Sequence, residues 1–386
     1  MEISAFIEPG LGKAGNSFTF SEIFGQPELW NQTFAKIVSE KKPLQEFLNR
    51  TIPLAARVIL TGAGTSAFIG LSLKGSWTRN LHQGTQVIPT TDLVTHPLDY
   101  ISPDVPLLLV SFARSGNSPE SVAAVKLADS LCKTCFHLII TCDPSGELAR
   151  YQSNSLKYVL VLPPQSNDKG LAMTGSYSAM LLSGLLISRL HELESLERQV
   201  QKLSKFGNRI FSTYCKAIHE VSLLNFKRAV FLGSGPLFGT ATESHLKLQE
   251  LTDGQIVCKN DSFLGIRHGP KAVIDENTLL VYILSSNSYV RKYEEDFLKS
   301  LQKGPGPLYI IAISENPVSC ISPDLNIYLT DEIKSLDEDF LAVCFILPAQ
   351  LLGFYKSDNL GLDPDSPSVS GAISRVVEGV KIYKYE

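Results

Sequence analysis

Residues 57–66, RVILTGAGTS, decide the fold of this chain, because a short β-rich run is followed at once by a glycine-rich turn. The run covers Arg57–Leu60, and the helical pattern behind the turn continues through Leu81. The stretch LLLVSFARSGNS at 107–118 repeats this arrangement and leads into a helical stretch that begins at Pro119. Strand, turn and helix in this order are typical of a parallel α/β sheet.

The same rhythm continues along the chain and then starts again. Further short apolar runs that predict strands lie at His137–Thr141, Leu156–Leu162, Ala229–Leu232, Thr278–Leu284, Leu308–Ile313 and Asn326–Leu329. One long helix is expected from Ser176 to about Phe206, between the two groups of strands. The chain is therefore predicted to be an α/β protein with two doubly wound parallel sheets flanked by helices, a duplication of topology rather than of obvious sequence identity.

The length of 386 residues suits two or three domains. We expect a helical lead at 1–50, a first α/β domain with its connecting helix at 51–210, and a second at 211–355. The second domain should close with a helix at Asp337–Tyr355. Residues 356–386 are expected to form a tail that completes the site.

The composition argues against several classes of protein. Lys and Arg total 35 and Asp and Glu total 39, so the formal charge of -4 disfavours a domain that holds nucleic acid mainly by charge. Hydroxyl side chains interrupt the uncharged stretch Leu171–Ile187, and Ala342–Tyr355 is too short to span a membrane. The first ten residues lack the basic and apolar regions of a secretory signal. We therefore expect a cytoplasmic chain without a membrane or nucleic-acid partner.

Seven thinly spread cysteines favour a reduced chain over a disulfide framework. The pair Cys132 and Cys135, with Cys142 beyond, allows a redox or metal interpretation, but no second pair of this kind accompanies it. The alternative is that these are small core residues at a turn from a helix to a strand. No HxxxH or HExxH pattern is present, so neither a metal nor a cofactor is expected.

Two hydroxyl-rich loops follow predicted strands. Thr65 and Ser66 begin one helix, and Ser115 and Ser118 precede the other, with Ser118 at the expected N-cap before Pro119. Helix N-termini attract anions, and the carboxyl ends of neighbouring parallel strands share one crevice. The loops therefore predict a site for a phosphate monoester, whereas each loop alone would also suit an ordinary capped helix.

A dinucleotide site is disfavoured, because GAGTSA at 62–67 breaks the GxGxxG spacing and Asp92 is the only acidic residue near the expected ribose position. No P-loop motif is present, so a kinase of that type is unsupported.

A third feature combines a charged helix with a histidine downstream. Glu243, Lys247 and Glu250 have the spacing of one helix face, which alone would usually be a solvated stripe of ion pairs. Arg267 and His268 follow in the segment GIRHGP, where a lone histidine is more often structural than catalytic. A carboxylate and an imidazole close to a phosphate site are nevertheless suitable groups for proton transfer on a sugar phosphate.

Together these motifs resemble the sugar isomerase (SIS) family. GAGTS and SFARSGNSPES resemble its two phosphate loops, and LKLQEL followed by RHGPKAVID resembles the second SIS domain in the isomerase half of glucosamine-6-phosphate synthase. The resemblance covers residues 50–350 as two tandem SIS domains. TFSEIFGQPELW at 19–30 and GAISRVVEGV at 371–380 resemble the two ends of the AgaS-type galactosamine-6-phosphate deaminase/isomerases, also known as tagatose-6-phosphate ketose/aldose isomerases.

The resemblance implies a role for each matching residue. Glu250 would move a proton between C2 and C1, and His268, from the neighbouring subunit in the synthase-like relatives, would assist ring opening. The phosphate would be held by Thr65, Ser66, Arg114, Ser115 and Ser118. The remaining contacts to the sugar would come from Thr174, Ser176, Lys247, Arg267 and Arg375. A homodimer with a shared active site is therefore expected.

Two departures from the synthase matter. Ala113 and Arg114 replace a serine and a glutamine of its phosphate loop, and an arginine could supply a charge-assisted contact instead. The stretch that ends in Ser374 and Arg375 lacks the lysine that forms a Schiff base with the ketose, and a guanidinium cannot perform that chemistry. The N-terminal cysteine of the glutaminase half is also absent. Synthesis of an amino sugar is therefore disfavoured.

The resemblance implies conversion of galactosamine 6-phosphate to tagatose 6-phosphate and ammonia, in amino-sugar catabolism. Two alternatives remain open on the same scaffold. One is a simple aldose–ketose isomerase or a deglycase of sugar–amine conjugates, which ammonia release would separate. The other is a non-catalytic sugar-phosphate sensor, although the first fifty residues show no basic helix-turn-helix pattern.

Overall fold

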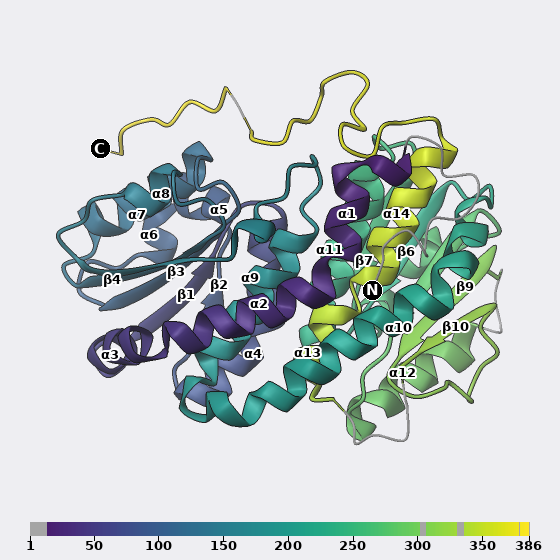
Figure 1. Cartoon of the computed structure of the whole chain (residues 1–386), viewed down its shortest axis with the longest axis horizontal. Helices are drawn as coiled ribbons and strands as arrows, with labels where there is room; N and C mark the ends of the chain where they lie inside the picture. The colour runs from purple at the N-terminus through teal and green to yellow at the C-terminus, as the bar shows by residue number, and fades with distance from the viewer. Residues whose placement is uncertain (1–13, 302–305, 330–335, 378, 386) are drawn as a thin grey trace. The chain divides into compact units, whose positions relative to one another are not determined.

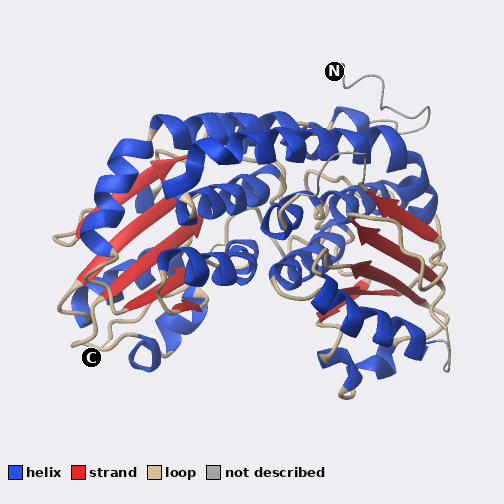
Figure 2. Cartoon of the chain, turned by 90° about the horizontal axis from the view of Figure 1, so that it is seen from below, coloured by secondary structure: helices blue, strands red, loops and turns tan. Residues whose placement is uncertain are grey.

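The computed structural model describes residues 14–301, 306–329, 336–377 and 379–385. The chain divides into two compact units, which we name after their sheets. The β1–β5 unit comprises residues 28–168, 175–200 and 373–386, and the β6–β10 unit comprises residues 1–27, 169–174 and 201–372, within the described ranges. Figure 1 labels the elements of each unit, and Figure 2 shows both sheets in red with their helices in blue.

The β1–β5 unit contains a five-stranded parallel sheet of order β2-β1-β3-β4-β5. The strands are β1 (Arg57–Thr61), β2 (Thr85–Val87), β3 (Leu107–Ala113), β4 (Cys135–Thr141) and β5 (Leu156–Val161). The helices are α2 (Gln26–Ser39), α3 (Lys41–Thr51), α4 (Thr65–Leu81), α5 (Thr90–Thr95), α6 (Pro97–Tyr100), α7 (Pro119–Leu131), α8 (Glu147–Arg150), η3 (Pro164–Ser166), α9 (Gly175–Ser188) and η4 (Leu190–Leu196).

The β6–β10 unit repeats this plan with the order β7-β6-β8-β9-β10, again with every strand parallel. Its strands are β6 (Arg228–Leu232), β7 (Val257–Asp261), β8 (Thr278–Ile283), β9 (Tyr309–Ser314) and β10 (Leu325–Tyr328). Its helices are η2 (Ala14–Asn16), α1 (Phe18–Phe24), α10 (Glu197–Ser222), α11 (Pro236–Leu251), η5 (Gly265–Arg267), η6 (Pro270–Val273), α12 (Ser288–Leu301), α13 (Glu338–Cys344) and α14 (Leu347–Asn359). The expected duplication of topology is confirmed.

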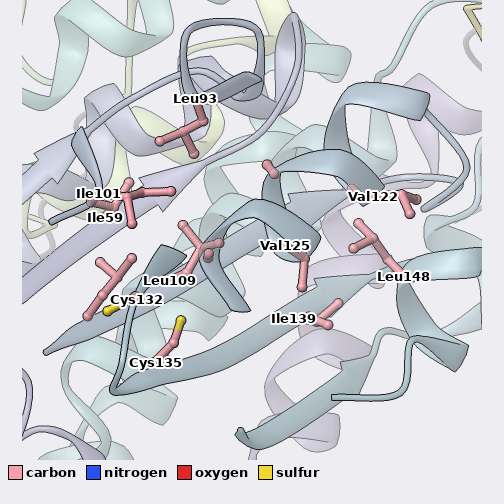
Figure 3. Packing of buried hydrophobic residues seen from close by; sticks show 14 residues of the cluster. Ile59, Leu93, Ile101, Leu109, Val122, Val125, Cys132, Cys135, Ile139 and Leu148 are labelled. Atoms are coloured by element: carbon pink, nitrogen blue, oxygen red, sulfur yellow. The ribbon is translucent and has the colours of Figure 1, made fainter. Parts of the chain in front are cut away.

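Helices cover both faces of the β1–β5 sheet. On one face, Ile59, Leu109 and Ile139 of the strands pack against Leu93 of α5 and Val125 of α7 (Figure 3). On the other face α4 packs against α9, where Trp77 Nε1 donates a hydrogen bond to the carbonyl of Gly184 at 3.0 Å. A side chain added at Gly184 would approach Leu73 of α4 within 2.3 Å. The glycine therefore allows the two helices to pack closely.

The first helix of the β6–β10 unit is held by the chain that follows α14. The Asp365 carboxylate accepts hydrogen bonds from Phe18 N at 2.9 Å and from Thr19 N at 2.7 Å. Phe20 of α1 also packs on Phe354 of α14, with ring centroids 5.6 Å apart. The beginning and the end of this unit therefore stabilise each other.

The segment Glu338–Asn359 is long and apolar enough to cross a membrane by length and composition, but its most apolar window is entirely buried within the structure. It consists of two helices rather than the one expected at 337–355. The chain turns between α13 and α14 at Phe345, and Pro348 lies in the first turn of α14, where its missing N–H costs no helical hydrogen bond. The apolar side chains of Glu338–Asn359 therefore pack inside the protein.

The expected single helix from Ser176 to Phe206 is wrong. α9 ends at Ser188, a 3-10 segment follows, and α10 starts at Glu197. Glu192 leaves helical geometry with φ -118° and ψ 19°. Leu190, Leu193 and Leu196 of the broken segment are all buried. The break therefore keeps the apolar side chains of this segment in the core.

The compact units also differ from consecutive domains at 51–210 and 211–355. The lead expected at 1–50 is divided, and its first thirteen residues lie outside the described part of the chain. α1 packs in the β6–β10 unit, whereas Trp30 of α2 donates a hydrogen bond to Ser178 Oγ at 2.9 Å within the β1–β5 unit. The tail is divided as well, since residues from Ile373 onward belong to the β1–β5 unit.

Candidate functional site

The loop between β1 and α4 is closely packed against the start of its helix. Gly64 has φ +53°, a left-handed conformation that glycine adopts without strain. A Cβ atom at Gly62 would lie 2.5 Å from the backbone of Ser66, so only glycine fits there. Thr65 and Ser66 occupy the first turn of α4 and are largely buried. The loop therefore places two hydroxyl residues at a helix N-terminus.

The loop between β3 and α7 supplies the second set of hydroxyls. Ser115 Oγ accepts a hydrogen bond from Asn117 N at 3.3 Å, and Gly116 has φ +67°. Ser118 occupies the N-cap position, but its side chain makes no capping hydrogen bond. It donates instead to Ser121 Oγ at 2.6 Å. The expected cap position is confirmed, and this helix start lacks the side-chain capping bond that an ordinary capped helix would have.

Both loops leave the same edge of the sheet. β1 and β3 are neighbouring parallel strands, with Thr61 at the end of β1 paired to Ser111, two residues before the end of β3. α4 and α7, which cover opposite faces of the sheet, therefore both begin at this edge, and the partial positive charges of both N-termini lie there. This arrangement suits a phosphate, because backbone N–H groups and hydroxyls are its ordinary protein ligands.

Arg114 connects this edge to the C-terminal tail. Its side chain is only 6% exposed, and Nη2 donates a hydrogen bond to the carbonyl of Arg375 at 2.5 Å. The Arg375 guanidinium in turn binds the Asp168 carbonyl through Nε at 3.0 Å and Asn167 Oδ1 through Nη2 at 3.1 Å. The structure thus brings together two of the residues that the sequence predicts to contact the sugar phosphate.

Asp168 is a residue of this region that the sequence motifs do not identify. Its carboxylate accepts hydrogen bonds from Ser176 N at 2.9 Å and from Ser176 Oγ at 2.5 Å. Ser176, expected to contact the sugar, is fully buried, and its hydroxyl is directed to this carboxylate. One feature of the sequence could have identified Asp168. It is an aspartate in the polar loop before a helix, where such residues commonly bind the N–H groups of the first turn.

Thr174 belongs to the other compact unit. It is fully buried, and its carbonyl accepts a hydrogen bond from Gln350 Nε2 at 3.4 Å. Gln350 also accepts a hydrogen bond from Gln26 Nε2 at 2.6 Å. This polar residue of the apolar stretch 342–355 therefore has a packing function inside the β6–β10 unit.

The charged helix α11 is the most distinctive part of the β6–β10 unit. Lys247 has no exposed surface, and its Nζ atom lies 3.2 Å from Glu243 Oε1 and 2.6 Å from Glu250 Oε2. Glu243 is also fully buried, whereas the Glu250 side chain is 24% exposed. The interpretation as a solvated stripe is therefore wrong for two of the three residues. Of the three, Glu250 alone combines ion pairing with access to solvent.

The two carboxylates determine the charge of Lys247. Burial alone would lower the pKa of this ammonium, but the negative charges of Glu243 and Glu250 more than compensate and raise it. Lys247 therefore stays protonated at neutral pH. A permanently charged ammonium orients the Glu250 carboxylate, which is a suitable arrangement for a group that accepts and returns a proton.

Arg267 and His268 lie on the surface of the same unit. η5 ends at Arg267, His268 follows it, and both side chains are exposed. The guanidinium of Arg267 lies over the Phe297 ring at 5.4 Å. Within the described residues, no hydrogen bond or ion pair joins His268 to Glu250. The single chain therefore does not assemble these two expected catalytic groups by direct contact.

Cys132 and Cys135 are buried where α7 ends and β4 begins, among Ile59 and Leu109 (Figure 3). Burial raises the pKa of the Cys135 thiol, which disfavours the thiolate needed for redox chemistry. Ligand atoms of Asp129, Cys135 and His137 lie within 4.8 Å of one another. Asp129 already accepts hydrogen bonds from His137 Nε2 at 2.8 Å and Tyr151 OH at 2.7 Å. These contacts favour the interpretation as core residues.

Comparison with known proteins gives consistent results. The model of the SIS domain family matches residues 53–188. The D-galactosamine-6-phosphate deaminase AgaS of Escherichia coli is 38% identical over 97% of this chain and 97% of its own length. The protein of the same name from Shewanella sp. (strain ANA-3) is 38% identical over 97% of this chain and 94% of its own length.

A solved structure also resembles this chain as a whole. The tagatose-6-phosphate ketose/aldose isomerase from Escherichia coli superimposes with a TM-score of 0.88 and 35% sequence identity, over 97% of this chain and 98% of its own. The likeness therefore includes both sheets and the segments that flank them.

Proposed function

We propose, from the premise that this chain belongs to the AgaS family of SIS-domain proteins, that it converts galactosamine 6-phosphate to tagatose 6-phosphate and ammonia. The observation that carries the proposal is the Glu250 carboxylate, partly exposed and held at 2.6 Å by the buried ammonium of Lys247. It supplies a proton acceptor in a chain that is similar to the deaminases along nearly its entire length.

The phosphate anchors the substrate at the β1–β5 sheet. Thr65, Ser66, Ser115 and Ser118, together with the N-termini of α4 and α7, are the proposed ligands. Arg114 adds a cationic donor next to them. Binding the phosphate fixes one end of the substrate, which lowers the entropic cost of the reaction.

Glu250 performs the proton transfer. It takes the proton from C2 of the open-chain amino aldose, the C2–H electron pair forms the C1–C2 double bond, and the carbonyl π pair moves to O1, which takes up a proton to give an enolamine. Return of a proton to C1, with formation of the C2–N double bond and loss of a proton from nitrogen, gives an imine at C2. Water then adds to this imine, and the C–N bond breaks to leave the ketone and ammonia. Lys247 holds the Glu250 carboxylate in place through the ion pair at 2.6 Å.

His268 assists ring opening and acts from a second copy of the chain. The side chain is exposed, and among the described residues no hydrogen bond or ion pair joins it to Glu250. A homodimer would bring this imidazole, with Arg267, to the substrate bound by the partner. This step rests on the resemblance to synthase-like relatives.

A simple aldose–ketose isomerase is the second candidate. It is favoured by the 35% identity to a protein named as a ketose/aldose isomerase. The same proton transfer by Glu250 would serve both reactions. Arg375 stands where a Schiff-base lysine is found in the synthase, and its permanent charge excludes it from that covalent step. Only the deaminase breaks a C–N bond, so the release of ammonia distinguishes the two candidates.

The cytoplasm is the proposed compartment. All seven cysteines are free thiols in the structure, and burial raises the pKa of several of them, including Cys142 to about 12. Unpaired buried thiols are typical of proteins in reducing compartments.

The decisive experiment is ammonia release by the purified protein from galactosamine 6-phosphate, glucosamine 6-phosphate and their N-acetyl forms. We expect rapid release from the galacto compound and its loss in E250Q. Ketose formation without ammonia would establish the isomerase instead. Binding of the sugar phosphates without turnover would favour a sensor.

A further inference from the structure

Because the two units have the same topology, each proposed phosphate loop of the β1–β5 unit has a corresponding loop in the β6–β10 unit. Arg57 of β1 pairs with Leu107 of β3, and Arg228 of β6 pairs with Thr278 of β8. Gly64 and Gly235 follow at the same distance along the chain, with φ,ψ of 53°,-126° and 56°,-128°. The β6–β10 unit therefore retains the backbone of the first phosphate loop.

The hydroxyls of that first loop are missing in the second unit. Pro236 and Leu237 stand where Thr65 and Ser66 stand in the β1–β5 unit, and Leu237 is fully buried. A proline has no N–H to donate, and a leucine offers no polar group. The loop after β6 therefore lacks the two hydroxyls that Thr65 and Ser66 supply, although Ser234 keeps one at an earlier position.

The second loop, after β8, retains its donors, and they bind a carboxylate of the same chain. Oε2 of Glu338 accepts hydrogen bonds from Ser286 N at 2.7 Å, Asn287 N at 3.1 Å and Ser286 Oγ at 3.3 Å. Ser285 Oγ donates a further, short hydrogen bond to the same oxygen. One anionic oxygen thus receives four donors, an arrangement typical of oxyanion binding.

The occupant comes from a distant part of the chain. Glu338 lies in the first turn of α13, more than fifty residues beyond the loop, and its neighbour Asp337 caps that helix. The carboxyl group of Glu294 in α12 accepts a hydrogen bond from the backbone N–H of Ser285 at 2.9 Å. The donors of the loop are therefore shared between two carboxyl groups, of which Glu338 receives most.

We propose that the loop Ser285–Asn287 is a second oxyanion site of the duplicated fold, and that the Glu338 carboxylate occupies it in place of a phosphate. The comparison rests on the proposed phosphate role of the loops in the β1–β5 unit. Each chain then binds one sugar phosphate although it contains two repeats. Removal of Glu338 should open the loop to a small tetrahedral anion.

The test measures the effect of inorganic phosphate on thermal stability in variants that also carry S66A, which weakens the proposed site in the β1–β5 unit. S66A/E338A should melt at a lower temperature than S66A. Saturating phosphate should raise its melting temperature by about 2–4 °C or more, since a ligand that binds only the native state stabilises it. Potassium chloride at matched ionic strength corrects for general salt effects.

The matched control is S66A/D296A, which removes one exposed negative charge from α12 without touching the loop. Its saturable response to phosphate should be smaller than that of S66A/E338A, because only the weakened site in the β1–β5 unit remains. Acetate, which supplies the lost carboxylate, should also stabilise S66A/E338A and compete with phosphate.

An equal phosphate response in S66A/E338A and S66A/D296A would overturn the proposal. If S66A/E338A folds only when phosphate is present, the proposal is supported. If S66A/E338A does not fold in either condition, S66A/E338Q is used in its place. Phosphate should displace the neutral amide of this variant and raise its melting temperature by a smaller amount. An unchanged melting temperature would refute the site. The outcome is independent of turnover, so a failure of the proposed enzyme activity would be recognised separately.

Discussion

The Nζ atom of Lys247 lies 2.6 Å from Oε2 of Glu250, although Lys247 itself is entirely shielded from solvent. The ion pair therefore extends from the interior of α11 to its surface. The two carboxylates raise the pKa of Lys247 above its ordinary value of 10.5. The ammonium therefore stays charged at every pH below 10.5 and loses its charge only as the pH rises through the higher pKa of the folded state. The charged ammonium of Lys247 thus orients Glu250 across the neutral range.

Replacement of Glu250 by glutamine should remove the proton acceptor while retaining its size. We expect kcat for ammonia release to fall by about 10²–10⁴-fold, the usual contribution of a positioned base, with little change in sugar-phosphate binding. Steady-state kinetics and equilibrium binding measure the two effects. The exposed Glu276→Gln is the matched control and should retain full activity. A comparable kcat in E250Q would exclude Glu250 as the base.

Loss of the Ser66 hydroxyl should weaken substrate binding. A hydrogen bond to a charged group contributes about 1.5–3 kcal/mol, so S66A should raise KM by roughly 10-fold or more. Ser130→Ala, at an exposed position of α7, should leave KM unchanged. If S66A changed only kcat, the phosphate would not be bound at the start of α4.

The buried cation of α11 should be needed for stability as well as for catalysis. K247M removes the positive charge between Glu243 and Glu250, and breaking a buried ion pair from one side costs about 3–5 kcal/mol. Urea denaturation measures this loss. The double variant E243Q/K247M, which also neutralises the buried carboxylate, should recover part of it. Equal destabilisation of both variants would show that charge is not the cause.

Glu294 should make the stability of the protein depend on pH. Burial raises the pKa of this carboxyl to about 7, in spite of the hydrogen bond from Ser285 N, from an ordinary value of 4.5. The folded state therefore keeps a proton that the unfolded chain loses, and this stabilisation, complete below pH 4.5, disappears as the pH rises through about 7. The wild type should lose about 3 kcal/mol relative to E294Q between pH 4.5 and 7.5. Parallel stability curves for the two proteins would contradict this assignment.

Arg375 should hold the tail to the β1–β5 unit. R375K keeps the charge but loses the planar guanidinium that contacts both the Asp168 carbonyl and Asn167. We expect chymotrypsin to cleave the tail at Tyr383 faster in R375K than in the wild type, as followed by mass spectrometry. Lys381→Arg, which changes an exposed residue of the same tail, should cleave at the wild-type rate.

Most of the fold could be predicted because buried parallel strands have a continuous apolar pattern. The two strands without a clear sequence pattern, β2 (Thr85–Val87) and β7 (Val257–Asp261), lie at edges of the two sheets. The first has only three residues, and the second contains Lys259 and Asp261. An edge strand buries less surface, so its sequence has a weaker pattern. The break after α9 could not be predicted, because neither glycine nor proline marks it.

The candidate site was predictable only where its residues lie close in sequence. Glu243, Lys247 and Glu250 are spaced three and four residues apart, and this spacing alone predicts that they contact one another on one helix face. The burial of Lys247 could not be inferred, since the same spacing is common on solvated helices. The contact between Arg375 and Asp168 joins residues about two hundred positions apart, and no local pattern indicates it.

The last part of the chain also has a consequence for biosynthesis. α1 needs the Asp365 carboxylate for the N–H groups of Phe18 and Thr19, and Arg114 needs the carbonyl of Arg375. The ribosome makes the amino-terminal residues first, so both sets of donors wait until residues 365 and 375 have been made. Neither unit can reach its final hydrogen bonding as a nascent chain. A stop codon placed just before Arg375 would leave all ten described strands intact. The released protein would nevertheless lack the carbonyl that Arg114 binds.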